Sequence, residues 1–305
     1  MRVVFLGTPD FAVNSLKALN DTHEVIGVVT QPDRPRGRGG KVTPSPVKVE
    51  ALRLGLTVYQ WEKISIEGVD ALKSLSPDIM VTAAYGQILS DEVLGIAKYG
   101  VINVHASILP RHRGSSPIQN AILSGDKETG VTIMQTAREV DSGDIIYVKK
   151  TDISDLDGTA CLTQRLSKIG AEALIEAIRM IETGVVKATP QRHSEATFCK
   201  LIRKSDTVID WSEDAITISK KIRAYDTMGA SSTIGGEVLK LYLPEVVDRS
   251  GQPGEIIDCS EKTGVIVACG KGAVKIGEML LSGGKRTKCT DLVRGRKLQK
   301  GVVLG

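Results

Sequence analysis

An asparagine and a histidine, separated by one residue, are the first residues in this sequence whose types and spacing suggest chemistry. Asn103 and His105 belong to the apolar run 101–105, which is typical of a buried strand. Alternate side chains of a strand project from the same face, so the two polar groups are expected to converge at its carboxyl end. An amide N–H and an imidazole can donate hydrogen bonds to a carbonyl oxygen that gains negative charge during a reaction. A polar pair that only fixes a loop is the alternative interpretation.

A carboxylate further along the chain can complete this set. Asp141 opens the segment Asp141-Ser142-Gly143-Asp144, which precedes another apolar run. From a loop, its carboxylate can reach the same strand end and hold His105 in the protonated form, although plain turn chemistry is an alternative. Asparagine, histidine and aspartate need no metal and include no serine or cysteine nucleophile. The set therefore favours direct acyl transfer to an external nucleophile, and the four scattered histidines show no zinc spacing.

Alternating strands and helices are expected to position these residues in the first half of the chain. Short apolar runs predict the strands, and apolar residues at helical spacing predict the helices between them. This order is typical of a doubly wound α/β domain with a mostly parallel sheet, whose ligand site lies beyond the carboxyl ends of the strands. The expected strands are 3–6, 25–29, 78–83, 101–105, 130–135 and 145–149, and the expected helices are 45–54, 67–75, 117–123 and 159–183.

The pattern changes after residue 184. Residues 185–205 mix proline, histidine, threonine and charge without a period, which is typical of a linker. A helix over 216–225 and then about five short strands with glycine-rich turns predict a small β-barrel. We expect a catalytic domain over 1–189, a linker over 190–205 and a barrel domain over 206–305. The barrel strands are expected at 238–243, 254–257, 264–268, 273–276 and 279–281.

The overall composition limits the class of protein. The 305 residues carry 40 Lys and Arg against 36 Asp and Glu, a net charge of +4, which excludes a uniformly basic coat for nucleic acid. The five cysteines lie far apart without a C-x-x-C pair, so no disulfide framework is expected. The sequence shows no secretory signal and no run of 18 apolar residues, so we expect a cytoplasmic protein without a membrane span. Nothing in it calls for an oligomer, and we expect a monomer.

Several segments together resemble one enzyme family. The stretches 103–110 and 113–119 resemble the signature of folate-dependent formyltransferases, and 129–135 and 141–144 extend the resemblance. Other segments are similar to the branch of that family that acts on methionyl-tRNA, so that the resemblance covers nearly the whole chain. These further segments are 5–12, 30–35, 37–39, 44–48, 83–89 and 209–212.

The resemblance implies a fold, a reaction and a set of site residues. The fold would be a Rossmann-like doubly wound domain followed by an OB-like barrel. The reaction would transfer the formyl group of 10-formyltetrahydrofolate, a cosubstrate, to the amino group of methionine on initiator tRNA, without a metal. By motif position the catalytic residues would be Asn103, His105 and Asp141. The folate-binding residues would be Ser107, Ile108, Leu109 and Pro110, with Tyr85, Gly86, Gln87 and Ile88 as the pocket wall around the pterin.

Two basic segments are candidates for tRNA binding. The segment 34–41 has four basic residues and three glycines, which is also the composition of a solvated flexible loop. Residues 285–300 hold seven basic residues and one acidic residue, which can equally serve solubility. On a barrel that resembles an OB fold, a role in following an RNA backbone is favoured. The resemblance and the charge pattern implicate Arg34, Arg36, Arg38, Lys41, Lys285, Arg286 and Lys288 in binding tRNA.

The sequence departs from the family pattern at one place that bears on packing, and it leaves two alternative functions. Asp226-Thr227-Met228-Gly229 replaces a turn that is usually rich in proline and tryptophan, which puts local packing and any tRNA contact there in doubt. The first alternative is a formyltransferase or hydrolase that acts on a small amine, such as a nucleotide sugar or a purine precursor. The second is a non-catalytic RNA-binding protein. The basic segments argue against the first alternative, and the catalytic trio argues against the second.

Overall fold

The computed structural model describes residues 1–36 and 40–305, and these residues form two compact units. The first unit joins Met1–Pro117, Glu128–Asp152 and Thr163–Cys199. The second unit joins Ile118–Lys127, Ile153–Leu162 and Lys200–Gly305. Each unit therefore draws on more than one stretch of the chain. We describe each unit by itself.

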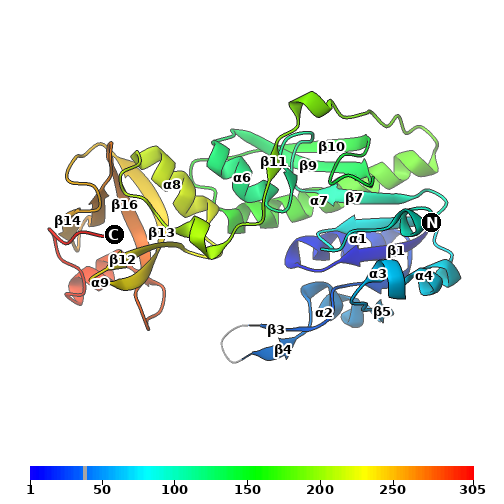
Figure 1. The fold of residues 1–305 in the computed structure, drawn as a ribbon, viewed down its shortest axis with the longest axis horizontal. Coiled ribbons are helices and arrows are strands. Elements are labelled where there is room, and N and C mark those ends of the chain that lie inside the picture. The colour runs from blue at the N-terminus through cyan, green and yellow to red at the C-terminus, as the bar shows by residue number, and fades with distance from the viewer. Residues whose placement is uncertain (37–39) are drawn as a thin grey trace. The chain divides into compact units, whose positions relative to one another are not determined.

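The first unit is built on a seven-stranded sheet (Figure 1). The strand order is β10-β9-β7-β6-β1-β2-β5, in which β7, β6, β1, β2 and β5 are parallel and β9 and β10 run antiparallel. The mostly parallel α/β sheet is therefore as expected. The strands are β1 (Arg2–Gly7), β2 (Glu24–Val29), β5 (Val58–Tyr59), β6 (Ile79–Ala83), β7 (Val101–His105), β9 (Glu128–Gln135) and β10 (Ile145–Asp152).

Helices cover both faces of this sheet, because its central strands are mostly apolar and buried. Every residue of β6 is buried, as is typical of a strand covered on both sides. On one face, the Ser167 hydroxyl donates to the Phe11 carbonyl at 2.6 Å and accepts from Asn14 Nδ2 at 3.0 Å, which joins three segments. These segments are α7 (Thr159–Glu182), η1 (Asp10–Ala12) and α1 (Val13–Thr22).

The opposite face holds an apolar core against three short helices. Val4 and Leu6 of β1 and Met80 of β6 pack there with Leu72 and Val93. Those last two residues come from α4 (Val69–Leu75) and α5 (Asp91–Leu94), and α3 (Ile64–Glu67) precedes them in the chain. The remaining helices before residue 190 are α2 (Pro46–Arg53) and α6 (Pro117–Ser124). The described residues include no helix long and apolar enough to cross a membrane.

Two small strand pairs in the first unit lie where the sequence predicted irregular chain. β3 (Arg34–Arg36) pairs with β4 (Lys41–Thr43), so the segment expected as a flexible loop begins and ends as an antiparallel hairpin. β11 (Phe198–Cys199) pairs in parallel with β8 (Arg113–Gly114), which places part of the expected linker against the chain that follows His105. Neither pair shows in apolar periodicity, because each strand has only two or three residues.

The second unit is an antiparallel sheet of short strands. Its order is β12-β13-β16-β15-β14, and β17 pairs with β16. The sequence predicted two strands over 273–281, but β16 is one continuous strand. Gly277 allows the strand to approach Leu243 closely rather than forming a turn, since a Cβ at position 277 would lie 2.9 Å from the Leu243 Cβ. The strands are β12 (Ala230–Ile234), β13 (Glu237–Val247), β14 (Ile256–Ser260), β15 (Gly264–Ala268), β16 (Ala273–Leu280) and β17 (Thr287–Lys288). This unit also contains the helices α8 (Ala215–Ala224) and α9 (Cys289–Arg294) and the 3-10 helix η3 (Lys204–Thr207). A further 3-10 helix, η2 (His193–Glu195), belongs to the first unit.

Residues 301–305 join the two edge strands of this sheet into a barrel. On one side, Ile256 N donates to the Val302 carbonyl at 2.8 Å, and Leu304 N donates to Gly254 O at 2.8 Å. On the other side, Thr233 N donates to Gly305 O at 2.7 Å, and Gly305 N donates back to Thr233 O at 3.0 Å. The hydrogen-bonded ring therefore runs from β14 through this segment to β12, and the barrel expected from the sequence is present.

The Asp226-Gly229 segment, where the sequence departs from the family pattern, has a definite structural role within the second unit. The Asp226 carboxylate accepts from Ala160 N at 3.1 and 3.3 Å, so it caps the first turn of α7 from a distant part of the chain. Gly158 leaves room for that carboxylate, since a Cβ there would lie 2.1 Å from Asp226 Oδ2. Burial raises the pKa of the Asp226 carboxyl. Local packing is thus maintained by a polar cap.

Candidate active site

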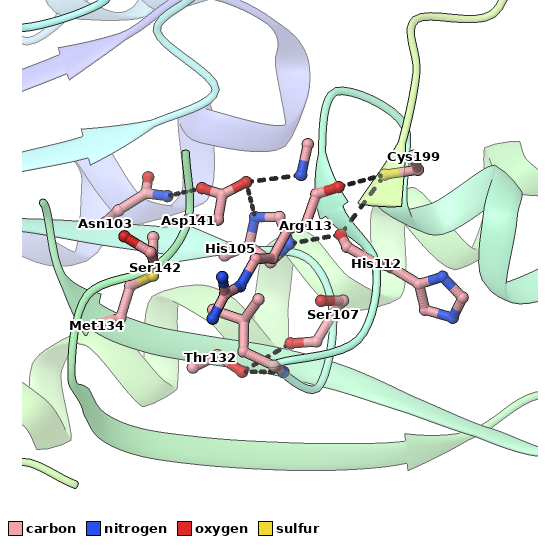
Figure 2. A network of polar contacts seen from close by, with 12 residues as sticks. Asn103, His105, Ser107, His112, Arg113, Thr132, Met134, Asp141, Ser142 and Cys199 are labelled. Atoms are coloured by element: carbon pink, nitrogen blue, oxygen red, sulfur yellow. Dashed lines mark hydrogen bonds and ion pairs between the residues drawn. The ribbon is translucent and has the colours of Figure 1, made fainter. Parts of the chain in front are cut away.

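The side chains of Asn103, His105 and Asp141 meet at the carboxyl end of β7 (Figure 2). Asn103 Nδ2 donates to Asp141 Oδ1 at 3.4 Å, and Thr82 Oγ1 donates to Asn103 Oδ1 at 2.9 Å. A carboxylate only accepts, so the amide nitrogen must face Asp141 and the amide oxygen must face Thr82. The second hydrogen on Nδ2 is then left to donate to a substrate oxygen.

Each ring nitrogen of His105 faces a protein acceptor. Nε2 lies 3.0 Å from the His112 carbonyl oxygen and therefore carries a proton, and Nδ1 lies 3.5 Å from Asp141 Oδ2. A substrate oxygen can accept from Nε2 only when the hydrogen bond to His112 is shared or exchanged. Catalytic hydrogen bonds commonly rearrange in this way when substrate binds.

The surroundings of His105 act on its pKa in opposite directions. The side chain is only 5% exposed, and burial lowers its pKa, although the neighbouring Asp141 carboxylate raises it in part. Arg113 lowers the pKa further. Both ring nitrogens face acceptors, an arrangement that suits a protonated ring, whereas burial opposes its charge. Growth of negative charge on a substrate is expected to favour the protonated ring.

The turn that carries Asp141 is held in a conformation that few residues adopt. Asp141 has a φ of 50°, a left-handed region that aspartate tolerates better than most side chains. Gly143 approaches β9 so closely that a Cβ would lie 1.9 Å from the Gln135 carbonyl oxygen. The Asp141 carboxylate accepts from Gly114 N at 2.8 Å, in addition to its contacts with Asn103 and His105. A polar turn is thus fixed against the end of β7.

The loop after β7 contains one of the two segments predicted to bind folate. Thr132, the register partner of His105 on β9, anchors this loop: its hydroxyl donates to the Ser107 carbonyl at 2.7 Å and accepts from Leu109 N at 3.1 Å. The Ser107 hydroxyl donates to the Arg111 carbonyl at 2.6 Å. Ile108 and Pro110 are half-buried beside them, and the Leu109–Pro110 bond is cis. The hydroxyl groups of Ser107 and of Thr132 on β9 are therefore used to shape the loop.

The second predicted folate segment follows β6, the neighbour of β7 in the sheet. Its side chains divide into two kinds. Tyr85 is buried in the apolar core, and Gln87 is committed to the protein, since it accepts from Ile64 N at 2.9 Å and donates to the Trp61 carbonyl at 2.9 Å. Ile88 is 82% exposed, and Gly86 has a φ of 91° with open space around it except for Gln31 Nε2 at 3.6 Å. Gly86 and Ile88 are the positions here that face outward.

The basic residues of the β3–β4 hairpin are only partly engaged by the protein. Arg34 forms an ion pair with Glu62, and Lys41 is exposed. Arg36 belongs to β3, and Arg38 lies outside the described residues. The base of the hairpin is held by Lys48, whose Nζ lies 2.6 Å from Asp33 Oδ2 and 2.7 Å from Gln60 Oε1. The hairpin therefore extends from a fixed base.

Three further basic residues lie in the second unit, around β17. Arg286 forms an ion pair with Glu278 and lies over the Tyr242 ring, with 4.1 Å from its guanidinium carbon to the ring centroid. Lys285 and Lys288 are exposed. Two of the seven residues predicted to bind tRNA, Arg34 and Arg286, thus have part of their charge offset by a carboxylate.

Sequence reasoning missed three residues that build the site. Thr82 orients the Asn103 amide, Thr132 anchors the loop after His105, and Gln191 hydrogen-bonds to the Asp141 turn. A threonine within an apolar run gives a weak signal, and Gln191 lies in the segment interpreted as a linker. Among residues 1–36 and 40–305, no three His, Cys, Asp or Glu residues gather in a way that could hold a metal ion.

Family models match both parts of the chain. Residues 1–178 match the model described as "Formyl transferase", and residues 201–297 match "Formyl transferase, C-terminal domain". The first match alone covers more than half of the chain and includes Asn103, His105 and Asp141. The chain therefore belongs to the formyl transferase family, in agreement with the resemblance seen in the sequence.

Individual relatives narrow the comparison. A protein of Sulfurihydrogenibium sp. (strain YO3AOP1) named methionyl-tRNA formyltransferase is 43% identical over 307 residues, which cover 99% of this chain and 99% of that protein. Among solved structures, the N-formyltransferase from Helicobacter canadensis in complex with folinic acid and dTDP-3-aminofucose has a TM-score of 0.69 at 17% identity and covers 94% of this chain and 100% of its own. HypX from Aquifex aeolicus with tetrahydrofolic acid has a TM-score of 0.66 at 20% identity; the match covers 96% of this chain and 47% of HypX. At these identities the two structures support the fold.

Proposed function

We propose that this protein transfers the formyl group of 10-formyltetrahydrofolate to the α-amino group of methionine on initiator methionyl-tRNA. The observation that carries the proposal is the full-length match, at 43% identity, to a protein named methionyl-tRNA formyltransferase. The meeting of Asn103, His105 and Asp141 at the end of β7 supports it, because these groups suit acyl transfer without a nucleophilic side chain.

In the proposed reaction, the unprotonated amine of the methionyl group attacks the formyl carbon. The bond between that carbon and the folate nitrogen breaks, and the surplus proton of the amine passes to the departing nitrogen through water or His105. Negative charge grows on the formyl oxygen during the attack. The free hydrogen on Asn103 Nδ2 is the preformed donor for that oxygen. Loss of one such donor typically lowers the rate by about 10²–10³.

His105 and Asp141 act together in this proposal. Burial opposes the charge of the His105 imidazolium, whereas the Asp141 carboxylate at 3.5 Å and the negative charge that develops on the formyl oxygen both stabilise it. His105 thereby donates to the formyl oxygen or relays the proton to the departing nitrogen. Asp141 also holds Asn103 in its donating orientation.

The two loops after β6 and β7 are proposed to bind the folate. Thr82 and Asn103 are register partners on these neighbouring parallel strands, so both loops leave the sheet at the same edge. The exposed apolar side chain of Ile88 and the open backbone at Gly86 suit one face and one edge of a flat heteroaromatic ring. The side chains of Tyr85, Gln87 and Ser107 are engaged within the protein, so the proposed contacts with the ring fall to Gly86 and Ile88.

The hairpin and the basic surface of the second unit are proposed to bind tRNA, each through phosphate contacts. Arg34 and Arg286 are both exposed and can exchange their carboxylate partners for phosphate; the Arg34–Glu62 pair is exposed on both sides and therefore weak. Strong dependence of binding on salt is expected for such contacts. We also propose that the protein acts as a monomer in the cytoplasm, which light scattering and fractionation can check.

A comparison of acceptors tests the proposed function. The protein is incubated with 10-formyltetrahydrofolate and one of three acceptors: Met-charged initiator tRNA, an aminosugar nucleotide or glycinamide ribonucleotide. We expect formyl transfer to the tRNA-linked methionine alone. Transfer to a small amine instead would refute the proposal, and tRNA binding without any transfer would favour the non-catalytic alternative. His105→Ala is the matched inactive control, and it is expected to bind tRNA as the wild type does.

A further inference from the structure

Gln191 lies in the segment that the sequence marks as a linker, yet its side chain is only 5% exposed and touches the turn that carries Asp141. Its Nε2 donates to the carbonyl oxygens of Asp141 at 2.9 Å and Gly143 at 2.7 Å. Its Oε1 accepts from Arg113 Nε at 3.1 Å and from Nη2 at 2.7 Å. The side chain thus bridges two segments that flank the site.

The hydrogen bonds fix the orientation of this amide. A guanidinium only donates, so the oxygen of Gln191 must face Arg113 and its nitrogen must face the two carbonyl groups. Both amide hydrogens and both lone pairs of the oxygen are then used, which is the full capacity of the group. A buried polar side chain that is fully satisfied is rigid, and loss of any partner leaves another group unpaired.

The backbone around Gln191 is anchored on both sides. Thr189 exchanges two backbone hydrogen bonds with Ile145 of β10, at 2.9 and 2.8 Å. Further along, the Thr197 carbonyl accepts from Arg113 N at 2.9 Å, and the Cys199 carbonyl accepts from Ser115 N at 3.2 Å. The segment between these anchors therefore cannot shift away from the site without breaking ladder bonds.

The position of Asp141 needs such support. Its φ of 50° is costly for a residue other than glycine and persists only where the surroundings hold it. Its carboxylate must reach Asn103, His105 and Gly114 at the same time. Gln191 donates to the carbonyl oxygens of Asp141 and Gly143, and these two hydrogen bonds secure both ends of this turn.

We propose that Gln191 is a positioning residue for the reaction: its amide clamps the Asp141–Gly143 turn to Arg113 and thereby sets the placement of the Asp141 carboxylate. This inference rests on the proposed formyl transfer. Gln191 touches no reacting atom and acts through Asp141. Residues 189–199 accordingly belong to the architecture of the active site.

Gln191→Glu isolates the clamp. The new carboxylate keeps an acceptor for Arg113, but it presents an oxygen in place of the amide nitrogen to the carbonyl groups of Asp141 and Gly143. The turn is then repelled while the contact with Arg113 remains. We expect kcat for Met-tRNA formylation to fall by about 10²-fold, the typical effect of a displacement near 1 Å, with KM for both substrates within about 3-fold of wild type.

His193→Ala is the matched control. His193 lies on the same segment, and its Nδ1 contacts the Arg113 guanidinium at 3.3 Å without touching the Asp141 turn. We expect its kcat to stay within about 3-fold of wild type. Equal losses in the two variants would overturn the inference, because they would assign the effect to the support of Arg113. A folded Gln191→Glu variant with wild-type kcat would overturn it as well.

A second measurement needs no activity. Asp141 raises the pKa of His105, whereas burial and the nearby Arg113 and His112 lower it. Displacement of Asp141 must therefore lower the pKa of His105 further, which an NMR titration of the imidazole follows in the free protein. Gln191→Met, a similar-sized variant that removes the hydrogen bonds without adding a charge, is the variant for this titration, because the new carboxylate of Gln191→Glu would itself raise the pKa of His105. An unchanged titration would refute the clamp, whereas a wild-type protein that transfers no formyl group would refute only the proposed function.

Discussion

Asn103→Ala tests the central element of the site, the preformed hydrogen-bond donor for the formyl oxygen. Asn103 is the residue of the trio whose side chain keeps a hydrogen for the substrate in the free protein, because His105 is bonded to His112 through Nε2. Alanine removes that donor and leaves β7 intact. The variant therefore separates the loss of a transition-state contact from the loss of the site.

The contacts of the Asn103 side chain set the size of the expected effects on stability and on rate. In the folded state the substitution breaks a 2.9 Å bond from Thr82 and a long 3.4 Å contact to Asp141. Thr82 has a second acceptor, the Ile102 carbonyl at 3.3 Å, and Asp141 keeps its 2.8 Å bond from Gly114. Stability should thus fall by only about 1 kcal/mol. In the transition state the missing donor should cost about 2.7–4 kcal/mol, a decrease of about 10²–10³ in kcat.

Single-turnover formylation of Met-tRNA measures this effect directly, and the melting temperature serves as the check on folding. We expect kcat to fall while KM for the tRNA changes little, since the donor acts mainly on charge that develops during the attack. Thr82→Val, which only loosens the amide, should cause a smaller loss. If Asn103→Ala keeps kcat within a few-fold of wild type, or if Thr82→Val is the more damaging change, the assignment of Asn103 as the oxyanion donor is wrong.

Three further predictions concern stability. Tyr85→Phe should leave the melting temperature unchanged or raise it, because the buried Tyr85 hydroxyl has no hydrogen-bond partner among the described residues; a clear decrease in a thermal melt would contradict this. Asp226→Asn should flatten the pH dependence of stability. Burial raises the pKa of this carboxyl in the folded protein above its ordinary 3.8, so the folded wild type binds more protons than the unfolded chain. Its stability therefore falls as the pH rises through this range, which urea titrations at several pH values can follow. The same pH dependence in the variant and the wild type would argue against this role of Asp226. Deletion of residues 302–305 should lower the free energy of unfolding by about 4 kcal/mol, because four backbone hydrogen bonds worth about 1 kcal/mol each are lost. Chemical denaturation of the deletion variant and the full chain measures the difference. A deletion variant with wild-type stability would rule out a closed ring.

The strands of the first unit could be predicted because burial on both faces leaves a direct mark on the sequence. β1, β6 and β7 are near-continuous apolar runs, and the polar Asn103 and His105 stand out at the end of one of them. Their shared face follows from the period of a strand. The meeting of Asn103, His105 and Asp141 was thus within reach of sequence reasoning, although their roles stay predictions.

Contacts between segments far apart in the chain could not be predicted in the same way. Gln191 lies 50 residues beyond Asp141 in a stretch without period, and its burial depends on Arg113 from a third segment. The burial that lowers the pKa of His105 could not be predicted for a related reason: the neighbouring Asp141 is visible as a motif, whereas burial is a property of the whole fold. The domain boundaries 1–189, 190–205 and 206–305 stay a prediction.

The ring that closes the second unit has a consequence for how this part of the chain folds. Its last bonds join Thr233 to Gly305, 72 positions apart, whereas three of the strand pairs, β12–β13, β14–β15 and β15–β16, are joined by short connections. Local hairpins are expected to form first, and closure must wait for a slow, long-range encounter. Until then β12 and β14 present unpaired backbone groups on which another chain can add a strand. The rate of closure, relative to the concentration of partly folded chains, therefore sets how much of the protein is lost to aggregation during folding.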